Sequence, residues 1–421
     1  MRLRFGGLWR HPDFVRLWAG ETVSIFGTLI GGIALGFTAV VYLHASAFQV
    51  ALVAASNTAA GICVGLFAGV WVDRLRRRPI MIAADIGRAA VLGSIPLAAV
   101  FGALRVEQLY LVGFLTGAMT AFFDVAYQSY LPTLVEPEEL VEGNSKLTAS
   151  ASVAEFGAFG ISGWLVQLLT GPGAIVVDAL SFLVSAIAVR QIRTAEPSPA
   201  PLDERTGMRA EIVEGIRAVA RDPLLRGLAG SAISLQLASG MIGAVYLLFA
   251  SRELGFSPGV LGMVFAVGGV TSLFGALFAA RLARRFGEGG AMMFGLLIAG
   301  GGAFTTAAAH GATLLSLALL ISAQIITDPA WTVYEINAIS LRQSTAPERL
   351  LGRVNAAVRF AGLLAMLAGG LIAGIVASTA GARLVLVMGG CIISAGSLWI
   401  LFSPARSMRH GEVAPDAAIS G

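Results

Sequence analysis

The chain has 421 residues, of which 56% are hydrophobic and only 13% are charged. A soluble domain carries about 25% charged residues, so this balance indicates an integral membrane protein. It excludes a disordered chain, a collagen-like fibre and a disulfide scaffold, the last because there are only two cysteines. The net charge of +4 would suit a nucleic-acid-binding protein, but the placement of the basic residues argues against nucleic acid as a partner.

Apolar runs long enough to cross a bilayer as helices recur along the chain. A bilayer core needs about 20 consecutive, mostly apolar residues in a helix. Such runs predict helices at 14–42, 47–72, 79–101, 107–130, 144–169, 172–189, 224–250, 258–280, 290–309, 312–337, 354–378 and 382–402. The first run is too long for a cleavable signal peptide. We therefore expect an all-α integral membrane protein whose twelve transmembrane helices form two pseudo-symmetric six-helix lobes.

The basic residues predict the orientation. Of the 29 lysines and arginines, all except Arg105, Arg252 and Arg383 fall at the amino terminus, in the tail or at the connections of one side. Cytoplasmic segments carry the excess of basic residues. Both termini are therefore expected in the cytoplasm.

A polar gap divides the chain into domains. Pro197, Pro199 and Pro201 open a stretch that ends in an amphipathic segment, which indicates a linker with a short interfacial helix, or a solvated linker alone. The expected domains are a first lobe over 1–190, a cytoplasmic linker over 191–223, a second lobe over 224–405 and a cytoplasmic tail over 406–421.

The two halves resemble each other. Three patterns recur in the same order at offsets of 204 to 211 residues, which indicates a duplication. They are Asp124 and Tyr130 with Asp328 and Tyr334, the basic segments 74–78 and 281–285, and the segments 137–144 and 347–355. Because each half has an even number of spans, the copies share one orientation, as in the parallel repeats of one large transporter class.

The segment Gly69-Val70-Trp71-Val72-Asp73-Arg74-Leu75-Arg76-Arg77-Arg78 resembles the signature loop of the major facilitator superfamily. Arg76 replaces the second glycine of that pattern. The stretches 14–18, 85–88, 137–144 and 178–182 are similar to the bacterial branch of macrolide-efflux and enterobactin-export proteins. The resemblance implies a twelve-helix transporter that works by alternating access in the inner membrane of a bacterial cell, without a cofactor. It also implies a conformational latch formed by Gly69, Asp73, Arg74, Arg77 and Arg78, although these arginines would equally serve to set the orientation.

Acidic residues inside the spans are candidates for proton coupling. An acid at the bilayer centre costs about 2.5–3.5 kcal/mol, so its presence suggests a function. Four such candidates are Glu155, Asp124, Asp178 and Glu21, of which Glu155 lies closest to the middle of its span. The alternative is a carboxyl group that is permanently paired, or kept neutral by hydrogen bonds.

A second set of polar and aromatic residues is expected to line a substrate cavity. Its members are Thr28, Phe123, Phe156, Phe159, Gln236, Asp328, Trp331, Tyr334 and Arg359. For each aromatic residue the alternative is packing between helices. Arg359 needs an anion nearby, and Asp328 or Glu335 is the expected partner. Asp85 and Arg88 are expected to pair with each other in a structural role.

These features predict proton-coupled export of an amphipathic small molecule such as a drug, a siderophore or a natural product. The alternatives are a nutrient importer, a lipid flippase, or a non-transporting receptor or assembly subunit. The sequence lacks GxxxxGK[ST] and a nucleophile elbow, and its four histidines are far apart along the chain. We therefore expect neither an enzyme nor a metal site. The expected partners of this monomer are its substrate, protons and the lipid bilayer.

Overall fold

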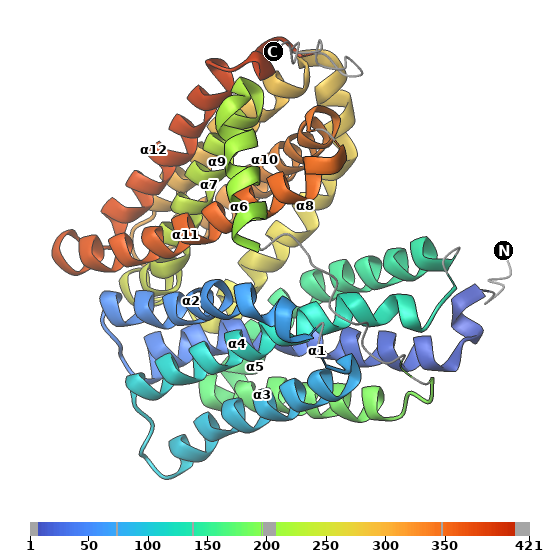
Figure 1. The fold of residues 1–421 in the computed structure, drawn as a ribbon. Coiled ribbons are helices and arrows are strands. Elements are labelled where there is room, and N and C mark those ends of the chain that lie inside the picture. The colour runs from blue at the N-terminus through green and yellow to red at the C-terminus, as the bar shows by residue number, and fades with distance from the viewer. Residues whose placement is uncertain are drawn as a thin grey trace, which may run out of the picture. The chain divides into compact units, whose positions relative to one another are not determined.

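The computed structural model describes residues 7–72, 75–136, 139–194, 196, 208–346 and 348–408, and every regular element in these ranges is a helix (Figure 1). The chain divides into two compact units. Helices suit a bilayer because their backbone hydrogen bonds are satisfied within the segment. The all-α membrane fold predicted from the sequence is confirmed.

The first unit consists of residues up to 202 together with 257–266. Its helices are α1 (Pro12–Phe37), α2 (Ala47–Val72), α3 (Arg77–Val100), α4 (Val106–Tyr130) and α5 (Leu140–Arg190). Helix α1 packs along α5, α3 packs against α4 and α5, and α2 packs against α4. Phe14, Leu17, Met81 and Tyr130 are among the residues of its apolar core.

Helix α5 is 51 residues long because it contains two of the predicted spans. Its backbone breaks at Thr170, where φ is 67° and ψ is 168°. The predicted spans 144–169 and 172–189 lie on either side of this break. Among the described residues, eleven helical segments are long and apolar enough to cross a membrane, and one of them, Gly160–Arg190, runs through the break. The first half of α5 supplies the remaining predicted span.

The second unit consists of residues 203–256 and those from 267 onward. Its helices are α6 (Met208–Arg221), α7 (Pro223–Leu248), α8 (Pro258–Phe286), α9 (Glu288–Ala307), α10 (Leu314–Thr345), α11 (Glu348–Ala380) and α12 (Ala382–Leu401). The start of α8 belongs to the first unit. Helix α6 is the short helix expected in the polar gap. It packs against α11, where Glu214 forms an ion pair with Arg353.

Backbone features repeat between the halves with an offset of 211 residues. Helices α1 and α7 each begin with proline after a capping residue, His11 or Asp222, and each ends in a π-helical turn, Thr38–Tyr42 or Phe249–Glu253. The residue that follows each turn by two positions, His44 or Gly255, has a positive φ. Thr170 corresponds in the same way to Gly381, which separates α11 from α12. These matches support the duplication predicted from sequence.

The segment before α1 is bound to the start of α5 through Glu142, which precedes the predicted span 144–169. Glu142 forms an ion pair with Lys146 and accepts a hydrogen bond from the Leu8 N–H at 3.3 Å. The hydrogen bond from Lys146 holds the pKa of the Glu142 carboxyl below its usual value. The Lys146 ammonium also lies 4.6 Å from the ring centroid of Trp9.

Candidate functional site

A buried ion pair lies between the helices of the first unit. Asp85 and Arg88 stand one turn apart on α3, are 0% and 3% exposed, and bond to each other. Arginine is well suited to such a place because its guanidinium is weakly hydrated and offers several donors. The predicted pairing of these two residues is confirmed.

Two aromatic rings and a hydroxyl complete the surroundings of Arg88. Its guanidinium carbon lies 4.4 Å from the ring centroid of Phe123 on α4 and 4.0 Å from that of Phe182 on α5. Both distances are within the range of cation–π attraction. Its Nη1 lies 3.4 Å from the Thr120 hydroxyl oxygen. Phe123 was expected on the wall of a substrate cavity, but it is 2% exposed and packs inside the unit.

Asp178 brings a second acid to this cluster from the second half of α5. It is 3% exposed, and Arg88 is a charged group that acts on it. The carboxyl fits against Gly31 of α1, where an added Cβ would lie 1.9 Å from its Oδ2. The Asp178 Oδ1 is buried and has no hydrogen-bond partner among the described residues.

Glu21 and Asp124 complete the set. Glu21 on α1 is partly buried, and its Oε2 is fully buried without a hydrogen-bond partner in the described part of the chain. The charges that act on Glu21 are those of Asp124, Arg88 and Asp85. Asp124 on α4 is exposed, so it connects the group with the surface of the unit. We refer to Glu21, Asp85, Arg88, Asp124 and Asp178 as the charge cluster; it contains four carboxyl groups and one guanidinium.

Several of the predicted site residues lie outside the charge cluster, and others are not among the residues that the structure describes. Thr28 on α1 is exposed. Asp73 and Arg74 are not among the described residues, and neither are the side chains of Glu155, Phe156 and Phe159, although the backbone of all three is helical. Gly69 is described only as part of α2.

The two described arginines of the predicted latch bind within the first unit. The backbone N–H groups of Arg77 and Arg78 donate to the Glu196 carboxylate, and the Arg77 guanidinium lies 3.8 Å from it. The Arg78 side chain donates to the carbonyls of Val189 and Arg190 at the end of α5. These contacts tie the start of α3 to the segment that follows α5.

The cavity residues predicted in the second unit are mostly packed between helices. Tyr334 on α10 is 3% exposed and its hydroxyl lies 2.8 Å from that of Ser231 on α7. Trp331 packs against the apolar core. Asp328 lies against Gly268 of α8, where an added Cβ would lie 1.9 Å from its Oδ2. Gln236 on α7 lies against Gly362 of α11, where an added Cβ would lie 3.2 Å from the Gln236 Cγ.

The ion pair expected for Arg359 does not form. Arg359 is exposed, and in the described ranges neither Asp328 nor Glu335 pairs with it. Asp328 does not pair with Arg359 because its carboxyl group points toward α8 rather than toward α11. Asn355, one turn before Arg359, accepts instead from Arg342 of α10 at 3.3 Å.

The sequence did not reveal the central place of Arg88, which looked like the partner of Asp85 alone. A usable signal was the match between small residues on α1 and polar residues on α5. Gly27 and Gly31 are four residues apart, and the side chains of Ser181 and Asp178 fill the space that these glycines leave. Such spacing is typical of close helix contacts in membranes.

The twelve predicted spans, the duplicated backbone features and the cluster inside the first unit are features of a membrane transporter. A family model described as the Major Facilitator Superfamily matches residues 17–370. The chain belongs to the major facilitator superfamily. It is a multi-pass membrane transporter, as the resemblance of its signature loop implied.

Three curated relatives of this transporter differ in how much of the chain they match. It is 28% identical to an uncharacterized transporter, y4rN, of Sinorhizobium fredii over 54% of this chain, and the match spans about half (55%) of that relative. It is 28% identical to the multidrug efflux pump Tap of Mycolicibacterium fortuitum over 85% of this chain and 89% of Tap. Macrolide efflux protein A of Streptococcus pyogenes is 26% identical over 43% of this chain and 44% of that protein.

Solved structures share the fold of this transporter. A bacterial homologue of the iron transporter ferroportin, in an inward-facing state, has a TM-score of 0.76 at 17% identity, covering 94% of this chain and 99% of that one. The nucleoside transporter NupG has a TM-score of 0.74 at 12% identity, covering 92% and 98%. Likeness at this level of identity extends to the fold alone.

Proposed function

We propose that this transporter exports amphipathic small molecules in exchange for protons, and that the charge cluster of the first unit carries the protons. Asp178 is the central residue of this proposal. The observation that carries it is that Asp178 and Glu21 each hold a buried carboxyl oxygen without a hydrogen-bond partner in the described part of the chain, while the nearby Arg88 pairs with Asp85.

Charge balance is the physical argument for protons. Arg88 already pairs with Asp85, so Asp178 and Glu21 have no cation of their own. A buried carboxylate without a partner is strongly disfavoured, and binding a proton removes the charge. A shift of the helices that changes the contact with Arg88 would then change which carboxyl groups hold protons. That is the property a proton-coupled transporter needs.

The exposure of the acids supports a route for the proton. Asp124 is exposed, Glu21 is partly buried and Asp178 is 3% exposed. The three carboxyl groups therefore differ in exposure, and the charges of both Asp124 and Arg88 act on Glu21. Protons would enter or leave through Asp124 and reach Asp178 by way of Glu21.

Export is supported by two of the relatives, Tap and macrolide efflux protein A, whose names describe efflux. Glu155 stays a candidate for proton coupling on the strength of its central position in the sequence. Thr28, Gln236, Trp331 and Arg359 stay candidates for substrate contact. The latch formed by Gly69, Asp73, Arg74, Arg77 and Arg78, and the cytoplasmic location of both termini, are further parts of the proposal.

A growth-protection assay tests export. The full chain is expressed in a bacterial strain stripped of its own exporters, which is then exposed to a panel of toxic amphiphiles that includes ethidium and macrolides. We expect protection by the wild type and none by Asp178→Asn or Glu21→Gln. Glu107→Gln is the matched control, since this exposed acid lies on α4 with Asp124 but at its far end. It should protect as the wild type does.

The other outcomes point to the alternatives. Greater sensitivity of the wild type than of the empty strain would favour import. A panel with no active compound would favour a lipid flippase or a receptor. Undiminished protection by Asp178→Asn would overturn the assignment of the charge cluster while leaving export intact.

A further inference from the structure

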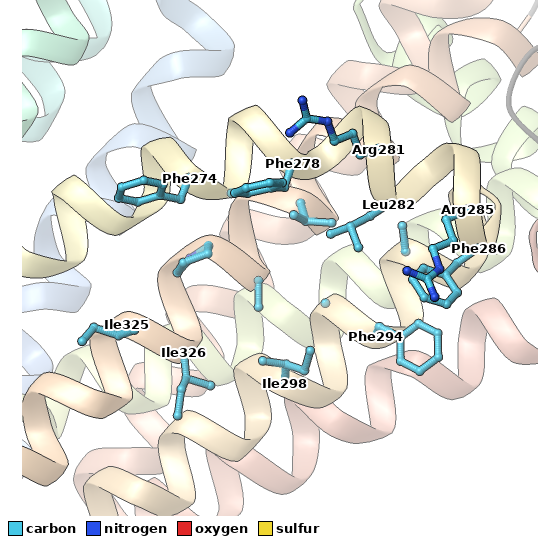
Figure 2. A pocket seen from close by; sticks show the side chains of 16 residues that line it. Phe274, Phe278, Arg281, Leu282, Arg285, Phe286, Phe294, Ile298, Ile325 and Ile326 are labelled. Atoms are coloured by element: carbon cyan, nitrogen blue, oxygen red, sulfur yellow. The ribbon is translucent and has the colours of Figure 1, made fainter.

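A groove on the second unit is formed by helices that take no part in the charge cluster. It runs between α8, α9 and α10, has a volume of about 660 Å³, and is lined by 16 residues (Figure 2). This volume lies within the range of about 300–1,000 Å³ that is usual for small-molecule sites. Its lining is apolar apart from two arginines, Arg281 and Arg285.

Small residues form the floor of the groove and large ones its rim. Gly275 of α8 and Gly295 of α9 approach the backbone of α10, since added Cβ atoms would lie 2.5 Å from the Pro329 carbonyl oxygen and 2.8 Å from that of Ala330. Large side chains stand exposed around this floor: Phe274, Phe278, Phe294, Ile298 and Ile325. The result is an elongated apolar trough rather than a flat helix face.

The two arginines lie at one end of the trough, in the last turns of α8. In Figure 2, Arg285 extends toward Phe294, whereas Arg281 extends to the other side of α8. Their guanidinium carbons lie 5.3 Å from the Phe286 ring centroid and 5.6 Å from that of Phe278. Both arginines are exposed, and neither has a carboxylate partner in the described part of the chain.

We propose that this groove binds an anionic phospholipid of the cytoplasmic leaflet, with its phosphate on Arg285 and an acyl chain along the apolar floor. Arginine binds phosphate strongly because its planar donors match the phosphate oxygens. The basic residues predict that the α8–α9 connection lies on the cytoplasmic side, where basic pockets between helices bind anionic headgroups. Arg281 extends to the other side of α8 (Figure 2), so Arg285 is the arginine assigned to the headgroup.

The chemistry of the groove favours a lipid over the transported molecule. A cationic amphiphile would meet Arg285 and no acid among the lining residues, so its charge would be repelled at the polar end. A molecule with an anionic head and a long apolar tail satisfies both ends. The lipid is held and not transported, and this inference holds whichever direction transport takes.

Lipid binding to the purified full chain tests the proposal. Native mass spectrometry in a mild detergent would compare phosphatidylglycerol with phosphatidylcholine of the same acyl chains. We expect the wild type to prefer phosphatidylglycerol, and Arg285→Ala to lower its affinity about fivefold, because a basic residue beside anionic headgroups contributes about 1 kcal/mol. Binding of phosphatidylcholine should stay unchanged. Arg284→Ala is the matched control, because Arg284 is exposed on the same turn but does not line the groove.

A photoactivatable phosphatidylglycerol with its reactive group in the acyl chain locates the site. Labelling is expected in the peptides of α9 and α10 that contain residues 291–298 and 325–333. Equal binding of the two lipids, an equal loss in Arg284→Ala, labelling confined to the first unit, or displacement of the lipid by ethidium would each overturn the proposal.

Discussion

Arg88 shows how much depends on a single side chain in the first unit. Its guanidinium pairs with Asp85 and lies between the rings of Phe123 and Phe182. Breaking a buried ion pair from one side leaves an uncompensated charge, which costs about 3–5 kcal/mol. The two partners are not equivalent here, because other acids surround Arg88 whereas it is the one basic member of the cluster.

This asymmetry predicts an order of stabilities. Arg88→Gln is expected to lower the free energy of unfolding by about 3–5 kcal/mol, and Asp85→Asn by less, because Asp178 and Glu21 still face Arg88. The double variant should be more stable than Arg88→Gln, since it removes both members of the pair. Thermal unfolding in detergent, followed by size-exclusion chromatography, measures all three. Equal losses in both single variants would contradict a shared Arg88.

Two neighbouring glycines of α1, Gly31 and Gly32, test whether Asp178 packs against α1. A Cβ at Gly31 would lie 1.9 Å from the Asp178 carboxyl, whereas one at Gly32 would meet nothing within 4 Å. Gly31→Ala should therefore destabilise the protein by about 1–3 kcal/mol. Gly32→Ala should be neutral, or stabilising by about 0.5–1 kcal/mol through helix propensity.

The companion change Asp178→Ala should restore much of the stability lost in Gly31→Ala. Melting temperatures of the purified variants report these effects. If the two glycines tolerate alanine equally well, Asp178 does not pack against Gly31.

The sequence predicted several of the functional candidates one by one, but it did not predict which of them lie together in the charge cluster. The cost of burying acids singled out Glu155 first and then Asp124, Asp178 and Glu21, and i to i+3 spacing paired Asp85 with Arg88. The direction of each side chain depends on how helices pack, which spacing along one helix does not determine. For this reason Arg359 was given a partner that faces another helix, and Phe123 was placed on a cavity wall although it packs beneath Arg88.

At the scale of elements, the apolar runs of the sequence were nearly sufficient to predict the bounds of the helices. The predicted run 47–72 coincides with α2, and 382–402 differs from α12 by one residue. Hydrophobicity fixes such helices because apolar runs of this length have few alternatives in a bilayer. The continuation of α10 to Thr345, beyond the predicted end at 337, was missed because polar residues extend a helix without lengthening its apolar run.

The break in α5 gives a prediction for the duplicated helix boundaries. Thr170 has φ 67° and ψ 168°, a conformation adopted almost only by glycine, and its counterpart Gly381 has φ 85° and ψ 159°. Thr170→Gly should stabilise the protein by about 1 kcal/mol, while Gly381→Thr should destabilise it by about 1–3 kcal/mol. Chemical or thermal unfolding of the two variants measures the difference. A loss of stability in Thr170→Gly would contradict the backbone conformation described for α5.

At the scale of the whole molecule, the two halves share a fold but differ in charge. The first unit holds the charge cluster, whereas the Asp328 region of the second has no described ion pair. Duplication thus preserved the helices, their caps and their breaks, and the matching pair Asp124 and Asp328, whereas the Asp85–Arg88 ion pair is described in the first unit alone. This asymmetry is the reason we propose proton coupling in the first unit, and substrate contact and lipid binding in the second.

Proton movement in proteoliposomes tests the central claim most directly. The purified full chain is reconstituted with a pH-sensitive dye inside the vesicles, and an amphiphile identified in the protection assay is added on one side. The account predicts proton movement that depends on this amphiphile in the wild type and in Glu107→Gln, and none in Asp178→Asn. Wild-type proton movement in Asp178→Asn, or transport of the amphiphile by the wild type without protons, would contradict it.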